Sequence, residues 1–179
     1  CLYSYASARV FVPLFLLGSA LLYGSELWAD RRRAIQAALL FIALSLPAVY
    51  HWTLPEGMAR AHYLLSWDPA GWFLNYLSYL SPDYLFLNGD ANLRHSLQDV
   101  GQLHVWECVT VALGLIVCAR RRERSYALIA LWLLLYPLPA ALTEPEHAIR
   151  SIVGAPLFAL LSGAGLDALL AWTPAHRKI

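Results

Sequence analysis

Two runs of arginine, Arg31-Arg32-Arg33 and Arg120-Arg121-Arg122-Glu123-Arg124, decide how this chain folds. Each run lies between two long apolar stretches. Arginine clusters that directly adjoin apolar spans are held on the cytoplasmic side of a membrane, so they indicate both the solvent and the orientation of the spans. A buried helix of a soluble domain has no physical reason to end in three consecutive guanidinium groups. The pattern predicts a membrane protein with several spans.

The composition agrees with this interpretation. Of the 179 residues, 59% are hydrophobic and 14% are charged, and the mean hydropathy is +0.51. Soluble domains contain about 25% charged residues. The formal net charge is only +1, which gives no bulk electrostatic attraction to nucleic acid, so no nucleic-acid partner is expected. Many of the Trp and Tyr residues lie near the ends of apolar runs, as in the aromatic belts at membrane surfaces.

Five apolar stretches are predicted to be transmembrane helices. They cover about residues 10–28, 34–52, 103–119, 126–142 and 151–172. Lengths of roughly 17 to 22 residues suit a hydrocarbon core about 30 Å thick. Pro13 is expected in the first turn of its helix, where proline is tolerated, and Pro47 is expected to kink the second helix. Pro137 and Pro139 interrupt the fourth. We therefore expect an all-α bundle of about five spans.

The fifth stretch has a face of small residues, which is typical of close helix packing in lipid. The face comprises Gly154, Gly163, Gly165, Ala155, Ala159, Ser162 and Ala164.

The arginine runs also predict a topology for the whole chain, 1–179, as a single transmembrane domain with several spans. Arg31–Arg33, Arg120–Arg124 and the C-terminus, which carries Arg177 and Lys178, are expected in the cytoplasm. The N-terminus, a long loop at 53–102 and a short loop at 143–150 are then external. Because the sequence opens on Cys1 in the middle of a pattern, without an initiator Met, we expect it to be the C-terminal part of a larger chain.

The long external loop contains the only mixed chemistry. Residues 69–80 are aromatic and apolar but short, which predicts a helix lying in the membrane interface. Ser81-Pro82 predicts a break, and Asn88-Gly89-Asp90 predicts a turn.

Acidic, basic and histidine side chains are expected to gather at the external surface. They are Arg9, Asp83, Asp90, Arg94, His95, Glu144, Glu146, His147 and Arg150. Arginines at a membrane edge can grip a phosphate in a bidentate fork, and carboxylates or histidines can take the proton of a hydroxyl. A lipid-linked phosphosugar would use both groups. The alternative is that these side chains are polar only because external loops contact water. Asp83, Asp90 and His95 offer metal-ligand atoms, but their spacing is not diagnostic and no metal is expected.

Two carboxylates fall inside predicted spans. Glu107 can lie within the third span or in its external first turn, where the helix dipole favours it. Asp167, near the cytoplasmic end of the fifth span, can pair with an arginine. Cys108 and Cys118 are about 15 Å apart on one helix, too far for a disulfide, and Cys1 completes no metal motif.

Three segments resemble a known family. Tyr84-Leu85-Phe86-Leu87-Asn88-Gly89-Asp90, continuing through Asn92, Arg94-His95-Ser96 and Gly101-Gln102-Leu103, is similar to an external-loop segment of bacterial membrane glycosyltransferases. These are relatives of the dolichyl-phosphate-mannose protein mannosyltransferases and the aminoarabinose lipid A transferases. Tyr3-Ser4-Tyr5-Ala6-Ser7-Ala8-Arg9 with Val12-Pro13-Leu14, and His147-Ala148-Ile149-Arg150-Ser151, resemble two further parts of the same family.

The resemblance implies a GT-C fold and a multi-pass enzyme of a bacterial inner membrane that transfers sugar, with inversion, from a polyprenyl-phosphate donor on the external face. The acceptor would be a lipid, a glycan or a protein, and no cofactor is implied. Arg9 and Arg150 would contact the lipid phosphate, and Asp90, Arg94 and His95 would order the loop over the cavity. Tyr5 and His147 complete the substrate-binding candidates. The catalytic aspartate of the family lies in a first external loop that no segment here matches, so a missing N-terminal half or another subunit would supply it.

Two other functions fit the sequence. One is a non-catalytic membrane scaffold or a subunit of a larger complex. The other is a transporter, which is less favoured because ionisable residues within the spans are scarce and no inverted repeat is apparent.

Overall fold

The computed structural model describes residues 6–55, 68–97, 99–143 and 145–172, and this part of the chain is helical and contains no β-strand. The elements are α1 (Ala6–Leu22), α2 (Gly24–Ala29), α3 (Arg31–Thr53), α5 (Pro69–Ser78), the π-helical turn η1 (Asp83–Leu87), α6 (Glu107–Arg120), α7 (Arg124–Leu135), α8 (Leu138–Ala141), the 3₁₀ turn η2 (Ile152–Gly154) and α9 (Ala155–Trp172). The all-α prediction is confirmed for these residues.

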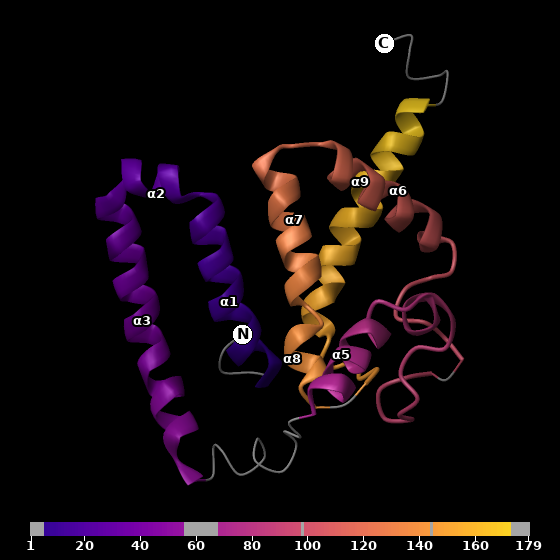
Figure 1. Ribbon diagram of the computed structural model, residues 1–179, viewed down its shortest axis with the longest axis horizontal. Helices are drawn as coiled ribbons and strands as arrows, with labels where there is room; N and C mark the ends of the chain where they lie inside the picture. Colours follow the sequence, from indigo (N-terminus) through magenta and orange to yellow (C-terminus); the bar gives the residue numbers. More distant parts are fainter. Residues whose placement is uncertain (1–5, 56–67, 98, 144, 173–179) are drawn as a thin grey trace.

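The long helices run between two ends of the molecule (Figure 1). α1 packs on α7 and α8, and α6 packs along α9. The α2 turn and the α6–α7 connection lie at the upper end of the view, whereas α5, α8 and the loop before α6 lie at the lower end. We call the upper end the arginine end, because α3 and α7 begin there with Arg31 and Arg124. We call the lower end the loop end.

Three helical segments of the described chain are long and apolar enough to cross a membrane: Arg31–Thr53, Arg124–Ala141 and Ile152–Trp172. They correspond to the second, fourth and fifth predicted spans. Large apolar side chains of α3, such as Leu39, Leu44 and Leu46, are about 60% exposed. A helix that leaves this much apolar surface uncovered is compatible with lipid as its solvent.

The first and third predicted spans are shorter than expected. α1 ends at Leu22, and Tyr23 separates it from α2 with φ −109° and ψ 23°. α6 has 14 residues, so it is about 21 Å long. It starts at Glu107 because the preceding turn is tighter than an α-helix, and the Glu107 carboxylate accepts the backbone N–H of His104 at 2.9 Å. The prediction that Glu107 lies in the first turn is therefore the correct alternative.

Two proline expectations have different outcomes. Pro13 lies in the interior of α1, because the helix begins at Ala6, so its predicted first-turn position was wrong. Pro137 and Pro139 do interrupt the fourth segment, where α7 gives way to α8. Their missing N–H groups leave carbonyls without helical donors. Those carbonyls belong to Leu133 and Leu135, and the carbonyl between them, of Leu134, accepts a hydrogen bond from Tyr76 Oη of α5 at 2.9 Å.

The predicted short helix of the long loop is present as α5. Its N-cap is Asp68, whose carboxylate accepts the N–H groups of Ala70 and Gly71 at 3.2 and 3.1 Å, and Pro69 occupies the first helical position. Asn75 Nδ2 donates to the Ala141 carbonyl at 3.4 Å. The cap and the proline favour the start of α5, and the bonds from Asn75 and Tyr76 hold the helix against the broken α7–α8 segment at the loop end.

The closest helix contact is between α6 and α9. A Cβ atom placed on Gly165 would lie 1.8 Å from the Thr110 carbonyl oxygen, and one on Gly114 would lie 2.0 Å from the Leu161 carbonyl oxygen. Thr110 and Ser162 share a hydrogen bond of 2.6 Å across the interface. The predicted small-residue face is thus a packing surface at Ser162 and Gly165, but Gly163 faces open space.

At the arginine end, the α1–α3 hairpin contacts the connection between α6 and α7. Arg124 forms an ion pair with Glu26 and donates to Ser25 Oγ at 3.3 Å. The α1–α3 hairpin and the α6–α7 connection therefore meet at one end of the bundle, as the two arginine runs predicted.

Candidate functional site

The loop end contains most of the buried polar side chains of the described chain. Asp90, His147 and Ser151 are 4%, 8% and 7% exposed. They come from two segments far apart in the sequence, the loop after η1 and the turn before α9. The contacts that hold these two segments together therefore define the geometry of the site.

Two glycines shape the first segment. Gly89 has φ +68°, a conformation that other residues rarely adopt, and it turns the chain after η1 as the Asn88-Gly89-Asp90 pattern predicted. Gly101 passes so close to η1 that an added Cβ would lie 2.4 Å from the Phe86 carbonyl carbon. Leu103 N then donates to the Leu85 carbonyl at 2.8 Å. Residues 88–97 and 99–103 therefore form a loop whose two ends both lie against η1, and we call it the 88–103 loop.

Asp90 ties this loop to the second segment. One carboxylate oxygen accepts the N–H of Asn92 at 2.8 Å, which forms a local turn. The other oxygen accepts the N–H of Ala148 at 2.8 Å. A buried carboxylate requires such partners, because burial without them is costly. Asp90 thus orders both the loop and the turn that carries His147.

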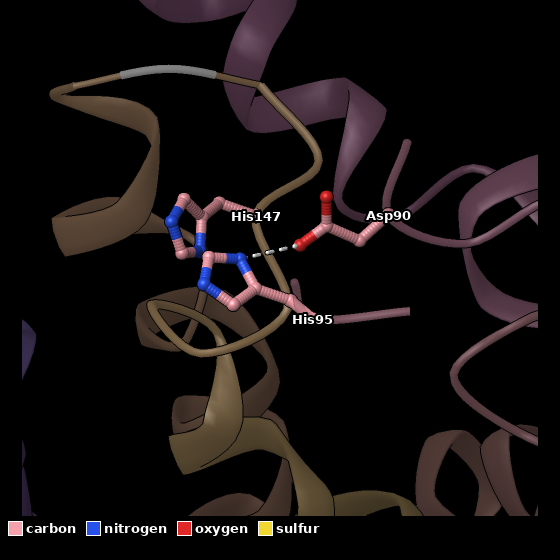
Figure 2. Close-up of side chains that lie close together, drawn as sticks. All are labelled: Asp90, His95 and His147. Carbon is pink, nitrogen blue, oxygen red and sulfur yellow. Dashed lines mark ion pairs between the residues drawn. The ribbon is translucent and has the colours of Figure 1, made fainter. Parts of the chain in front are cut away.

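Two imidazoles complete the cluster (Figure 2). His95 Nδ1 lies 3.5 Å from the nearer Asp90 oxygen. The rings of His95 and His147 have centroids 4.5 Å apart and are tilted by 36°. The side chains of Asp90, His95 and His147 therefore form one compact group, which we call the Asp-His-His cluster.

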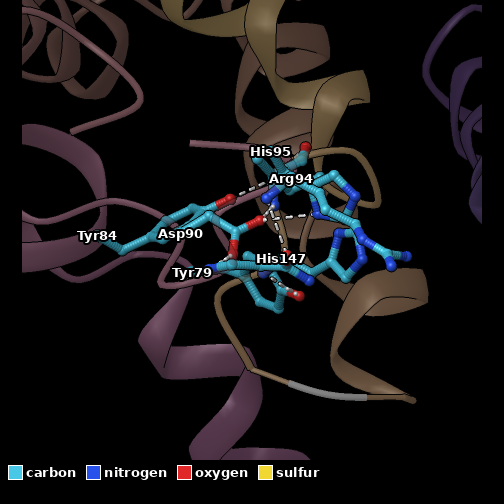
Figure 3. Close-up of polar contacts among 9 residues, drawn as sticks. Tyr79, Tyr84, Asp90, Arg94, His95 and His147 are labelled. Atoms are coloured by element: carbon cyan, nitrogen blue, oxygen red, sulfur yellow. Dashed lines mark hydrogen bonds and ion pairs between the residues drawn. The ribbon is translucent and has the colours of Figure 1, made fainter. Parts of the chain in front are cut away.

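Two tyrosines beside the cluster, Tyr79 and Tyr84, support it through hydrogen bonds (Figure 3). Tyr79, which is fully buried, accepts the backbone N–H of His147 through its hydroxyl at 3.1 Å. Tyr84 Oη and Ser151 Oγ are 2.7 Å apart in a buried hydrogen bond. Burial raises the pKa of the Tyr84 phenol well above its usual range, so it stays neutral and serves as a hydrogen-bonding group.

Glu146 lies close to two other carboxylates, those of Asp83 and Asp90. Partial burial raises its carboxyl pKa, and the carboxylates of Asp83 and Asp90 raise it further. The loop end is therefore an acidic environment as well as a histidine-rich one.

The arginine candidates occupy different places. Arg94 is exposed and lies beside the cluster (Figure 3). Arg150 is half-buried on the turn after His147 and donates to Thr143 Oγ1. Arg9, in the first turn of α1, lies over the Trp52 ring of α3 with its guanidinium carbon 4.9 Å from the ring centroid. Tyr5 and Glu144 lie outside the described residues.

A cavity of about 260 Å³ opens next to the cluster. Its polar lining comes from Tyr84, His95, Gln102 and Ser151, and the remainder is mainly apolar. A cavity with few polar groups in an apolar wall is a common form of ligand site. His95 belongs to both the cavity wall and the Asp-His-His cluster.

Sequence reasoning missed several side chains of this site. The supporting roles of Tyr79 and Ser151 and the anchoring of Arg150 by Thr143 depend on contacts between segments, for which the sequence has no local signal. His147 was predicted as a site residue but not as a neighbour of His95. Of the three side chains noted from the sequence as possible metal-ligand atoms, Asp90 and His95 lie together with His147, whereas Asp83 accepts the Asn88 side-chain amide at 2.6 Å.

No known protein family, no curated protein and no solved structure matches this chain.

Proposed function

We propose that this chain is the membrane portion of a glycosyltransferase that takes a sugar from a polyprenyl-phosphate donor and transfers it to an acceptor on the external face of a bacterial inner membrane. The observation that carries the proposal is the combination of the buried Asp-His-His cluster and its neighbouring cavity at the loop end of an apolar bundle. A lipid-linked sugar needs apolar surface for its tail and a polar, hydrogen-bonding site for its head.

The orientation in the membrane belongs to the same proposal. The arginine end faces the cytoplasm and the loop end faces outward, because arginine-rich connections are retained inside. α1 and α6 cross together with the three longer segments, which makes five spans. Both are short for a hydrocarbon core of about 30 Å, so the bilayer thins locally beside them.

Arg150 is the strongest candidate for the phosphate of the donor. It follows His147 on the same turn, and its contact with Thr143 orients the guanidinium at the end of α8. A guanidinium matches a phosphate in a bidentate fork that lysine cannot reproduce. Arg9 is the second candidate, since it projects from the first turn of α1 at the loop end and stacks on Trp52.

Binding of a radiolabelled polyprenyl phosphate to the purified chain in detergent micelles tests this assignment. We expect Arg150→Ala to weaken binding at least tenfold, and Arg150→Lys to restore only part of it. Arg32→Ala, an exposed arginine at the opposite end, is the matched control and should bind as the wild type does. Equal binding by Arg150→Ala and wild type, with both proteins folded, would remove Arg150 from the phosphate site.

One observation favours a non-catalytic scaffold as the second function. Both oxygens of Asp90 accept backbone N–H groups, which is a structural use of the carboxylate. A scaffold would retain the cluster but bind polyprenyl phosphate no better than any anionic detergent. Competition by an excess of anionic detergent therefore separates the two functions, because only a donor site keeps its labelled ligand.

A further inference from the structure

We propose that Asp90, His95 and His147 bind one divalent transition-metal ion of the zinc class, which fastens the 88–103 loop to the turn before α9. One ligand atom from each side chain lies within 4.8 Å of the others. This site goes beyond the proposed sugar transfer. Metal binding alone tests it, whatever the outcome for the transferase.

The donor types fit this class of metal. Two imidazole nitrogens and one carboxylate oxygen form a donor set that Zn²⁺ accepts, with a fourth position left for water or a ligand. Mg²⁺ prefers oxygen donors in an octahedral arrangement and is a poor match for two imidazoles. The chemistry of the cluster therefore selects a borderline transition metal over a hard cation.

The geometry is close to that of a metal site. Two ligand atoms bound about 2.1 Å from one tetrahedral ion are about 3.4 Å apart. His95 Nδ1 and the nearer Asp90 oxygen are already 3.5 Å apart. The ligand atoms of the three side chains are up to 4.8 Å apart, so the widest pair has to approach by more than about 1 Å. Rotation of the histidine side chains can supply this movement.

The burial and electrostatics of the cluster favour a cation. The side chains of His95 and Asp90 are 17% and 5% exposed, and within the described chain His95 Nδ1 makes no hydrogen bond. A buried carboxylate beside two imidazoles is stabilised by a positive charge placed among them. A metal ion supplies that charge without requiring two neighbouring rings to carry protons.

Surrounding hydrogen bonds already hold the ligands in place. The Asp90 oxygens are fixed by the N–H groups of Asn92 and Ala148, and the His147 backbone is fixed by Tyr79. Metal-binding side chains in proteins are commonly oriented by such outer contacts. The fourth coordination position has access to the neighbouring cavity through His95, which lines it.

Metal content of the full chain, purified in detergent through an affinity tag without histidine, tests the site. The protein is stripped with a chelator, dialysed and exposed to Zn²⁺, and bound zinc is measured by elemental analysis. We expect one zinc ion per chain in the wild type. His95→Asn and Asp90→Asn should bind at least about 100-fold more weakly, because removing a direct ligand costs more than removing an outer contact. His104→Asn, at an exposed histidine beside α6, should retain full binding.

The visible absorption of Co²⁺ bound to the wild type tests the site even if a variant fails to fold. Co²⁺ bound in this four-coordinate site should give a visible absorption band that Zn²⁺ removes and excess Mg²⁺ does not. Substoichiometric zinc with no cobalt band in the wild type would overturn the proposal. So would zinc binding that survives in His95→Asn and Asp90→Asn, or binding that is lost equally in His104→Asn.

Discussion

At the scale of single residues, buried polar side chains fasten the loop end together. Asp90, in the loop after η1, accepts the N–H of Ala148. Tyr84, in η1, forms a hydrogen bond with Ser151, in the turn before α9. Ser151 Oγ also lies 3.2 Å from the Ala148 carbonyl oxygen, and either hydroxyl can be the donor in the bond between Tyr84 and Ser151. The Asp90–Ala148 and Tyr84–Ser151 bonds each join segments that are distant in the sequence.

Tyr84→Phe tests the contribution of one such bond. The variant keeps the ring but leaves Ser151 Oγ without this buried hydrogen-bond partner, so the free energy of unfolding should fall by about 1 kcal/mol. Tyr50→Phe, at a tyrosine that is 69% exposed on α3, is the control and should change stability by less than about 0.5 kcal/mol. Unfolding in mild detergent with a denaturant measures both values.

A double-mutant cycle with Ser151→Ala assigns the effect to the pair. The combined variant should lose less stability than the two single losses together, because both substitutions remove the same bond. Strictly additive losses would mean that Tyr84 and Ser151 act independently.

Contacts between single residues of the site were the least predictable from the sequence. It placed Asp90, His95, His147 and Arg150 at one surface, since all four lie outside the apolar stretches and on the same predicted side. It could not predict that His95 and His147 are adjacent, because their contact depends on the Gly89 turn and on the Tyr79 hydroxyl that holds the His147 backbone. Arg9 remains a candidate whose observed contact is the Trp52 ring.

At the scale of elements, the α6–α9 pair is held by close backbone approach. Gly114 and Gly165 leave no room for a side chain, and the Thr110–Ser162 hydrogen bond lies between them. In lipid, such contacts replace the hydrophobic effect as the force that associates helices. α6 is short, so its position depends on this packing more than the positions of longer helices do.

Gly165→Ala tests this interface against a matched control in the same helix. The new Cβ would overlap the Thr110 carbonyl oxygen, so the helices must separate, and we expect a loss of about 1–3 kcal/mol. Gly163→Ala adds the same methyl group in open space and should be neutral or stabilise α9 by up to about 1 kcal/mol. Thermal unfolding in detergent compares them, and equal losses at both positions would contradict the packing.

Helix positions were largely predictable, because the long apolar runs coincide with the long helices, as is expected of runs that would have to form their hydrogen bonds internally in lipid. The second and fifth predicted spans match α3 and the η2–α9 segment closely. The errors arose where local chemistry overrides hydropathy. Glu107 delays the start of α6 by capping a turn, and the Tyr23-Gly24 step interrupts the first stretch. The hydropathy averaged over a window of residues does not include either effect.

At the scale of the whole molecule, the two ends differ in chemistry. The arginine end carries exposed guanidinium groups and the Arg124–Glu26 ion pair. The loop end carries the Asp-His-His cluster and the tyrosines that support it. This polarity along the helix axes was the principal expectation from the two arginine runs, and it underlies both the proposed orientation and the proposed external site.

Compartment-specific cysteine labelling tests that orientation most directly. In a chain whose Cys1, Cys108 and Cys118 are replaced by serine, a single cysteine is introduced as Leu97→Cys in the loop or Arg122→Cys in the α6–α7 connection. Leu97 is 90% exposed and Arg122 is exposed, so both thiols can react. In right-side-out vesicles, a membrane-impermeant maleimide should label Leu97→Cys alone, and Arg122→Cys should react only after the vesicles are opened. Labelling of both cysteines from the same side, or the reverse order, would contradict the account.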